Sequence, residues 1–320
     1  MEPAFAPARP LVFVAGALRS GSTLLSLMLA RHPSIDCPGE FDYLFDALGE
    51  DGGAAAAAGI DQESLDAFLQ EHYGFLMQGL EMAPAASTSA RLRAHAARFA
   101  VDDKVLALCV HRGFLSAHEI FPEARFIHLL RDPRDCARSA IGMGWAGNVY
   151  HGLKPWLRAE RSWERLRPRL TEDQFIEVRF EQLVAEPQRE LTRVAAFLGL
   201  SFDPRMLDLS GSSYAPPSAR FADQWRRTMS PRDQGLVCTR AGDLMVRRGY
   251  ERSGSHASQL AWPAAALLSL HDRMVRHRFR IDRFGPRLYV SELLGRLPGL
   301  RDLHRRTVSE MLVIDKRFMQ

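Results

Sequence analysis

The sequence has few cysteines and no long apolar run, and both absences narrow the classes of protein to which it can belong. Its cysteines, Cys37, Cys109, Cys136 and Cys238, show no C-x-x-C spacing, which argues against a metal site or a disulfide framework. The apolar run at residues 11–17 is too short to span a bilayer and does not have the flanks of a signal peptide. We therefore expect a cytoplasmic protein without a metal site.

The chain also lacks a strong overall charge. Its 320 residues carry a formal net charge of +4, with 46% apolar and 25% charged residues, values that are ordinary for globular proteins. The basic residues are unevenly placed, however, because six arginines fall between Arg273 and Arg287. They indicate either a solvated helix face or a surface for an acidic partner, such as an anionic membrane. We predict no nucleic-acid partner, and the oligomeric state stays open.

Four segments have the pattern of strands, namely residues 11–15, 105–110, 125–130 and 174–180. The first three are nearly continuous apolar runs, which are typical of strands covered by helices on both faces. Helical patterns occur between and after them at residues 22–31, 62–80, 135–141, 156–170 and 188–198. The alternation predicts an α/β fold of three layers, with a parallel sheet flanked by helices.

The organisation of the chain follows from shifts in composition. A long insertion at residues 41–100 separates the first two strands and contains a glycine- and alanine-rich stretch at 52–59, predicted to be a loop. Residues 253–258 have the composition of a linker, and the helical, arginine-rich segment after them has no assigned role. We predict an α/β domain at residues 1–252 and a helical C-terminal extension at 253–320.

The segment GALRSGST, from Gly16 to Thr23, lies between the first strand and a helix. Backbone amides in this context cradle anions, as in P-loop nucleotide-binding folds. Against the pattern G-x-x-x-x-G-K-[ST], the glycines and Thr23 fit, but Ser22 replaces the lysine and a cation comes earlier, as Arg19. This departure argues against an ATPase or GTPase. A turn that uses glycine and serine only for its geometry is the structural alternative.

A second anion site is predicted where the strand at residues 125–130 ends. Arg131 leaves the carboxyl end of that strand, the edge at which open α/β sheets bind ligands. Arg131 and Ser139 could hold a phosphate, one by charge and one by its hydroxyl. An ion pair of Arg131 with Asp132 or Asp135 is the alternative. Two anion sites on adjacent loops suit a nucleotide with phosphates at its 3′ and 5′ positions.

Here the sequence resembles a known family. RSGSTLL at residues 19–25 and RDPRDCARS at 131–139 resemble the 5′-phosphosulfate loop and the 3′-phosphate segment of the sulfotransferase superfamily, whose donor is 3′-phosphoadenosine 5′-phosphosulfate (PAPS). Further similarity lies in VRFEQLVAEP at 178–187, FLGL at 197–200 and RRGY at 247–250, so the resemblance spans about residues 10 to 250. It implies PAPS as co-substrate, PAP as product, no metal, and donor binding by Arg19, Ser20, Gly21, Ser22, Thr23, Leu24, Arg131 and Ser139.

The resemblance also implies catalytic residues. His-Pro at 32–33 and Cys-Pro-Gly-Glu at 37–40 are similar to a stretch of protein-tyrosine sulfotransferases that carries the catalytic glutamate. Glu40 is thus the expected general base, and Lys104 is expected to stabilise the leaving phosphate. Arg19 is the third expected catalytic residue. A carboxylate at a helix start and a surface lysine are the structural alternatives. His111, just after the second predicted strand, is the alternative base, as in the small-molecule branch.

Position alone suggests the residues that contact the adenine, which are expected among Trp225, Arg226, Arg227 and Tyr250. The acceptor is expected to be a hydroxyl of a peptide tyrosine, a carbohydrate, a lipid or a small metabolite. Two other functions stay open from the residues: a P-loop kinase, which would need the missing lysine and a magnesium-binding acid, and a non-catalytic nucleotide-binding module.

Overall fold

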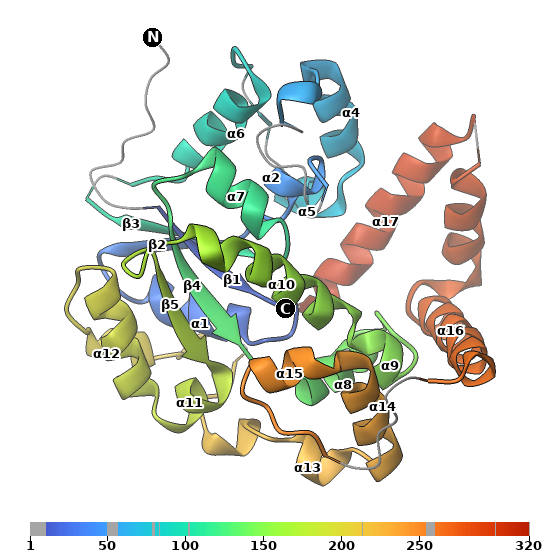
Figure 1. Cartoon of the computed structure of the whole chain (residues 1–320). Coiled ribbons are helices and arrows are strands. Elements are labelled where there is room, and N and C mark those ends of the chain that lie inside the picture. Colours follow the sequence, from blue (N-terminus) through green and yellow to red (C-terminus); the bar gives the residue numbers. More distant parts are fainter. Residues whose placement is uncertain are drawn as a thin grey trace.

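A five-stranded sheet, in which every pair of neighbours is parallel, forms the centre of the molecule (Figure 1). The computed structural model describes residues 11–49, 57–78, 81–82, 84–101, 103–212, 214–253, 260–297 and 299–319. The strand order is β2-β3-β1-β4-β5. The strands are β1 (Leu11–Gly16), β2 (Ile35–Glu40), β3 (Val105–Val110), β4 (Arg125–Leu130) and β5 (Phe175–Arg179).

Four of these strands match the prediction, and β2 was not predicted. Its sequence, IDCPGE, contains a proline and a glycine, which are poor strand formers. The strand tolerates them because it lies at the edge of the sheet and its register against β3 shifts between Asp36 and Gly39. This bulged edge strand is important because it carries Glu40 to the end of the sheet.

Helices cover both faces of the sheet, which confirms the predicted three-layer α/β fold. On one face, α7 and α10 pack over Phe13, Leu108 and Phe126 of the sheet. On the other face, α1, α11 and α12 pack over Val12 and Val14. The main helices of the domain are α1 (Ser22–Ala30), α2 (Tyr43–Asp46), α4 (Gln62–Glu71), α5 (Tyr73–Gln78), α6 (Thr88–Ala97), α7 (Phe114–Ile120), α8 (Pro133–Gly142), α9 (Val149–Gly152), α10 (Lys154–Leu166), α11 (Phe180–Ala185), α12 (Pro187–Phe197), α13 (Trp225–Thr228), α14 (Pro231–Ala241) and α15 (Asp243–Arg247).

The predicted helix at residues 62–80 is divided at His72 into α4 and α5, and its last two residues lie outside the described ones. His72 has extended backbone angles and its side chain pairs with Asp46 at 2.8 Å. Most of the predicted loop at 52–59 and of the predicted linker at 253–258 also lies outside the described residues. The insertion thus covers the sheet mainly through α2, α4, α5 and α6.

The C-terminal segment is helical, as predicted, and consists of α16 (Trp262–Gly295) and α17 (Arg301–Met319). The helix α16 is broken at Gly285, whose φ of 79° and ψ of 156° are not helical, and Pro286 follows. The two helices pack on each other, and they stand to one side of the sheet (Figure 1). No helix within the described ranges is long and apolar enough to cross a bilayer.

Candidate active site

The predicted anion loop leads from the fully buried central strand β1 into α1, at the carboxyl edge of the sheet. Arg19 and Gly21 both have left-handed backbone angles, with φ of 73° and 99°. A Cβ atom at Gly21 would come 2.3 Å from Cδ2 of Phe180, so glycine is required there. Arg19 adopts a conformation that is costly for a non-glycine residue, and such strain collects at functional sites.

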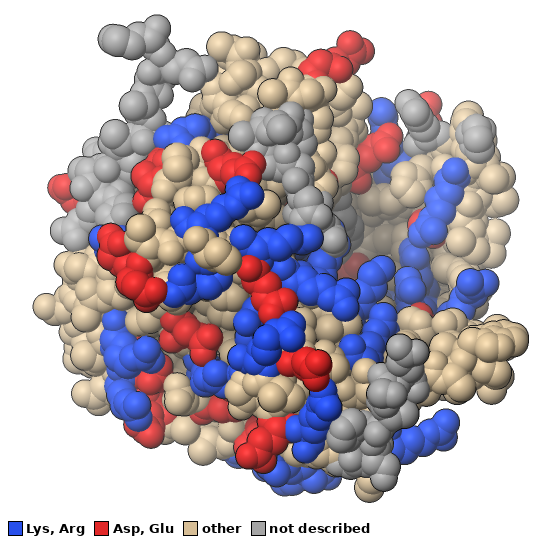
Figure 2. Space-filling view, viewed as in Figure 1, with Lys and Arg blue, Asp and Glu red and all other residues tan. Residues whose placement is uncertain are grey.

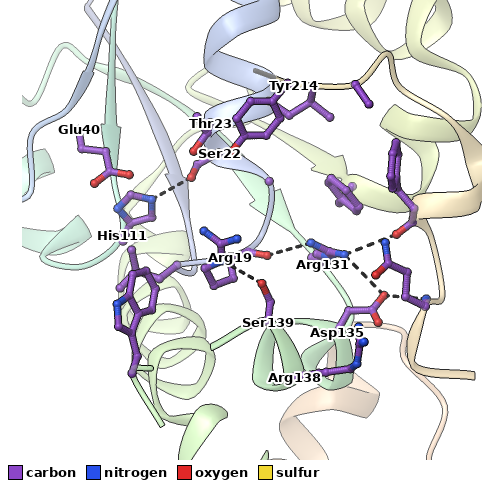
Figure 3. A pocket seen from close by; sticks show the side chains of 18 residues that line it. Arg19, Ser22, Thr23, Glu40, His111, Arg131, Asp135, Arg138, Ser139 and Tyr214 are labelled. Carbon is purple, nitrogen blue, oxygen red and sulfur yellow. Dashed lines mark hydrogen bonds and ion pairs between the residues drawn. The ribbon is translucent and has the colours of Figure 1, made fainter. Parts of the chain in front are cut away.

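The two predicted anion segments contact each other through their arginines (Figure 3). Nε of Arg19 donates a hydrogen bond to Oγ of Ser139 at 2.9 Å, and Nη1 of Arg131 donates to the backbone carbonyl of Arg19 at 3.1 Å. Nε of Arg131 is buried and has no hydrogen-bond partner within the described part of the chain. A buried donor of this kind indicates that a ligand acceptor completes the site.

Arg131 is held in place by an aromatic ring and a carboxylate. Its guanidinium lies over the ring of Phe180, 4.0 Å from the centroid, and Nη2 is 3.8 Å from Oδ2 of Asp135. Burial raises the pKa of Asp135. Its carboxylate also accepts hydrogen bonds from the backbone N–H groups of Gln224 and Trp225, at 3.2 and 2.7 Å. Asp135 therefore ties a segment distant in sequence to the second anion loop.

A chain of three hydrogen-bonded side chains links the loop to the end of β3. Nδ1 of His111 lies 2.7 Å from Oδ2 of Asp42, and Nε2 lies 2.9 Å from Oγ of Ser22. The backbone N–H of His111 donates to the other oxygen of Asp42 at 2.7 Å. Burial alone would lower the pKa of His111, but the Asp42 carboxylate outweighs it and raises the pKa. The imidazolium form is thus stabilised next to the anion loop.

Glu40 ends β2 beside this chain, and its side chain is exposed to the cavity (Figure 3). One oxygen of Glu40, one of Asp42 and a ring nitrogen of His111 lie within 4.8 Å of one another. This spacing would also suit a cation. Both ring nitrogens of His111 already have partners, so metal binding would have to displace a hydrogen bond.

These groups line one cavity of about 400 Å³, which is a volume suited to a small ligand. Most of the predicted site residues come together on its wall, although they derive from several different loops. The predicted residues that line it are Arg19, Gly21, Ser22, Thr23, Leu24, Glu40, Arg131, Ser139 and the alternative base His111. Ser20 is completely buried, and it does not contribute to the lining. Its hydroxyl has no partner among the described residues.

The structure does not bring Lys104 to the cavity. Lys104 directly precedes β3, and Val105 pairs with Ile35 at the start of β2. Because the strands are parallel, this is the amino edge of the sheet, whereas Glu40 and His111 lie at the carboxyl edge. Lys104 stands seven positions before His111, roughly 20 Å along an extended strand. Lys104 cannot reach a leaving phosphate in the cavity.

Arg227 and Tyr250, predicted near the adenine, also lie outside the cavity lining. Arg227 is exposed, and its Nη2 donates to the carbonyl of Arg220 at 2.7 Å. The hydroxyl of Tyr250 donates to Oε2 of Glu181 at 3.1 Å, and its ring is buried. The ring of Tyr250 is therefore part of the packed interior. Trp225 is buried, as expected of a core residue, and Cζ of Arg134 lies 3.5 Å from the centroid of its ring.

Sequence reasoning missed Asp42 and part of the cavity wall. Asp42 follows Glu40 by two positions. A second carboxylate so close to the expected base was the signal that could have indicated it. Trp145 and the segment around Tyr214 and Phe221 had no motif that indicated a site. The missed lining residues are Leu18, Asp135, Arg138, Trp145, Phe180, Tyr214, Ala215, Phe221 and Gln224.

Comparison with known proteins identifies the family. A family model described as the sulfotransferase family matches residues 10–204, which is more than half of the chain. The chain therefore belongs to the sulfotransferase family, as the resemblance of its motifs predicted.

The chain is similar to protein-tyrosine sulfotransferase 2 of Gallus gallus, with 27% identity over 213 residues that cover 62% of this chain and 53% of the relative. It thus matches about half the length of that relative. Similarity to omega-hydroxy-beta-dihydromenaquinone-9 sulfotransferase of Mycobacterium bovis is 26% over 155 residues, covering 44% of this chain and 39% of the relative.

Among solved structures, the sulfotransferase domain of the Synechococcus PCC 7002 olefin synthase superimposes with a TM-score of 0.53. It is 23% identical and covers 78% of this chain and 98% of that domain. This likeness shows that the two chains have the same fold.

Proposed function

We propose that the chain transfers the sulfuryl group of PAPS to an acceptor hydroxyl and releases PAP. The observation that carries this proposal is the contact between two arginine-bearing loops at one sheet edge, where Nη1 of Arg131 donates to the carbonyl of Arg19 at 3.1 Å. The two loops lie close enough to hold both ends of a nucleotide phosphorylated at the 3′ and 5′ positions. Family membership supports the same reaction.

The donor would be held mainly by charge and by backbone amides. Arg19, Ser22, Thr23 and the N-terminus of α1 would bind the 5′-phosphosulfate, because a helix N-terminus favours an anion. Arg131, whose buried Nε has no partner within the described residues, would bind the 3′-phosphate together with Ser139.

His111 would assist the donor as a cation. Because Asp42 raises the pKa of His111, the imidazolium form is favoured, and its Nε2–H then donates to Oγ of Ser22. That bond leaves the Ser22 hydroxyl proton available for an oxygen of the phosphosulfate. The positive charge beside the loop would stabilise the charge that develops on the departing phosphate. This is the role that the family resemblance implied for Lys104.

Glu40 would act as the general base. It ends β2, is exposed to the cavity and lies next to the imidazole, whereas both ring nitrogens of His111 are occupied. In the reaction, the acceptor oxygen forms a bond to sulfur, its proton passes to Glu40, and the bond between sulfur and the bridging oxygen breaks. The electron pair of that bond stays on the phosphate of PAP. Protonated Glu40 then loses its proton to water.

The acceptor side of the cavity is formed by Glu40 and Trp145, whose side chain is 42% exposed. The Trp145 ring lies near Arg19, whose guanidinium carbon is 5.8 Å from the ring centroid. An exposed aromatic ring in the same cavity as the base suits an acceptor with an apolar or aromatic body next to its hydroxyl. The relatives named above act, by their names, on protein tyrosine and on a menaquinone. We propose an acceptor hydroxyl of this kind, on a peptide, carbohydrate, lipid or small metabolite.

The first test is a calorimetric titration of the purified chain with PAP, without and with Mg²⁺. PAP is expected to bind without metal, and Arg19→Ala is expected to weaken binding about tenfold or more. Ser139→Ala tests the second loop with a smaller change, because Arg131 is mostly buried and its removal risks the fold. Arg189→Ala, which alters an exposed arginine on α12, serves as the control.

Two results would redirect the assignment. Binding of ATP with Mg²⁺ in place of PAP would contradict the proposal and favour a P-loop kinase. Tight binding of PAP without any sulfate transfer from PAPS, across acceptors with phenolic, sugar and lipid hydroxyls, would favour a non-catalytic nucleotide-binding module.

A further inference from the structure

Exposed apolar side chains are concentrated in the C-terminal helices. Eleven of the sixteen large apolar residues that are exposed in the described part of the chain lie between Trp262 and Val313. In the first half of α16 they form a stripe, made of Trp262, Leu267, Leu270, Met274 and Ile281, with exposed fractions of 80%, 68%, 54%, 55% and 39%. We call these five residues the apolar stripe. Exposed apolar patches of this kind mark binding surfaces.

The opposite face of α16 is anchored to the domain. The carboxylate of Asp272 accepts a hydrogen bond from the backbone N–H of Gly147 at 2.6 Å, and Nδ2 of Asn148 donates to the carbonyl of Leu268 at 2.8 Å. The ring of Phe279 packs so closely on Gly144 that a Cβ there would be 2.1 Å from it. Residues 268, 272 and 279 therefore lie on the side of α16 that faces the domain, and the apolar stripe lies on the side that faces away from it.

The charges around the apolar stripe are mainly positive. Residues 262–284 contain five arginines and two aspartates. One aspartate, Asp272, is buried under the helix, which leaves Asp282 as the exposed one. Arg273 and Arg278 are exposed and lie five positions apart, which places them near the two opposite borders of the stripe. In Figure 2, blue basic side chains lie above and below the tan surface at the lower right, where α16 begins.

We propose that the apolar stripe of α16 binds the surface of an anionic lipid membrane. A helix that exposes a Trp at its start and Leu and Met side chains on one face, bordered by arginines, has the composition of an interfacial helix. The long arginine stems can lie along the acyl boundary while their guanidinium groups reach lipid phosphates. A second copy of the chain fits less well, because pairing two such stripes would bring arginine-rich borders together.

The proposed membrane contact lies close to the cavity. Trp145 lines the cavity, and its neighbour Gly144 is in contact with Phe279 of α16. The membrane contact is therefore one packing layer from the site at which the acceptor is expected. This arrangement would allow the chain to work on a hydroxyl presented at a lipid surface, but lipid binding itself does not depend on the proposed reaction.

The test is co-sedimentation of the full chain with vesicles, either of phosphatidylcholine alone or with one third phosphatidylglycerol. The chain is expected to sediment with the anionic vesicles, and less so at high salt because salt screens the arginines. Leu270→Ser is expected to lower the partition coefficient about tenfold. Val246→Ser on α15, where the side chain is 51% exposed, is the matched control and should leave it unchanged.

The charged border has its own pair of variants. Arg278→Glu is expected to weaken binding to the anionic vesicles, while Arg189→Glu on α12 should not. Unchanged PAP binding and thermal unfolding would show that each variant keeps its fold. The proposal is overturned if the wild-type chain stays in the supernatant, or if Leu270→Ser and Val246→Ser sediment alike. It is also overturned if sedimentation velocity shows a dimer that Leu270→Ser dissociates, without vesicle binding.

Discussion

Two buried histidines in the described part of the chain pair with carboxylates, one at the cavity and one in the core. Nδ1 of His111 lies 2.7 Å from Asp42, and its other nitrogen faces Ser22 of the anion loop. Nε2 of His128 lies 3.3 Å from Glu160, and its ring stacks on Trp163 at 4.1 Å between centroids. Both pKa values are raised because a carboxylate outweighs burial. The two imidazole–carboxylate pairs have the same chemistry, and they differ in the groups that each imidazole contacts.

His111 lines the cavity, whereas His128 is enclosed between β4, β5 and α10. The carboxylate of Glu160 also accepts from Nε of Arg248 at 2.5 Å, which makes it the centre of a buried network. A raised pKa therefore does not by itself identify a functional histidine, because structural ion pairs produce the same shift. Variants of the two pairs can distinguish a catalytic histidine from a structural one. A variant of the proposed base, Glu40, gives the largest loss of activity with which they can be compared.

The largest effect is expected from Glu40→Gln, which removes the proposed base at the cavity. We expect kcat to fall about a thousandfold, a typical loss for a general base. PAP affinity and thermal unfolding should stay close to wild type, because Glu40 is exposed. The measurement is sulfate transfer from PAPS at saturating donor. If His111→Gln abolishes transfer and Glu40→Gln leaves it intact, the histidine is the base.

Next in size is the core pair. Glu160→Gln should lower the free energy of unfolding by about 3 kcal/mol, because it leaves a buried cation without its carboxylate. The folded-state pKa of His128 is raised above 6.5, so its contribution to stability is complete below that pH and is lost as pH rises through the raised value. Urea unfolding at several pH values should show a weaker pH dependence in the variant. Turnover per folded molecule should not change.

Disrupting the cavity pair of Asp42 and His111 should instead change the turnover. Asp42→Asn removes the anion that raises the pKa of His111, while Glu40 still favours the imidazolium and Arg112 opposes it. We expect kcat/KM to fall about thirtyfold. Its alkaline limb should also move to lower pH, because His111 now loses its proton earlier. A pH profile that shifts equally in Glu160→Gln would show that the two pairs are not functionally distinct.

The smallest effect is expected from Ser22→Ala, which removes one hydroxyl between His111 and the donor. PAPS affinity should fall about fivefold, the equivalent of one hydrogen bond or about 1 kcal/mol. The matched control is Ser26→Ala, one turn along α1, where the hydroxyl contacts Sγ of Cys109 at 2.7 Å. Calorimetry should show normal PAPS affinity for that variant. Equal losses in both would indicate a general effect on α1.

Much of the sheet could be predicted because its central strands are continuous apolar runs. The strands β1, β3 and β4 have this pattern, and β5, at Phe175–Arg179, lies within the predicted range of 174–180. The edge strand β2 could not, since Pro38 and Gly39 oppose strand formation and only pairing with β3 stabilises it. The two loops proposed to bind the donor could be located because the residues of each are contiguous in the sequence. Arg227 and Tyr250 were proposed from their positions alone, and their side chains bond elsewhere.

The sequence by itself determined the α/β class and located the two segments proposed to bind anions, because apolar periodicity and contiguous motifs are local properties of the chain. Only the tertiary structure decided which residues share the cavity. Asp42 and His111 are 69 positions apart and meet because β2 and β3 are neighbours in one sheet. Lys104 and His111 are close in sequence and are separated because a strand carries them to opposite edges. Long-range pairing is set by packing, which no local pattern specifies.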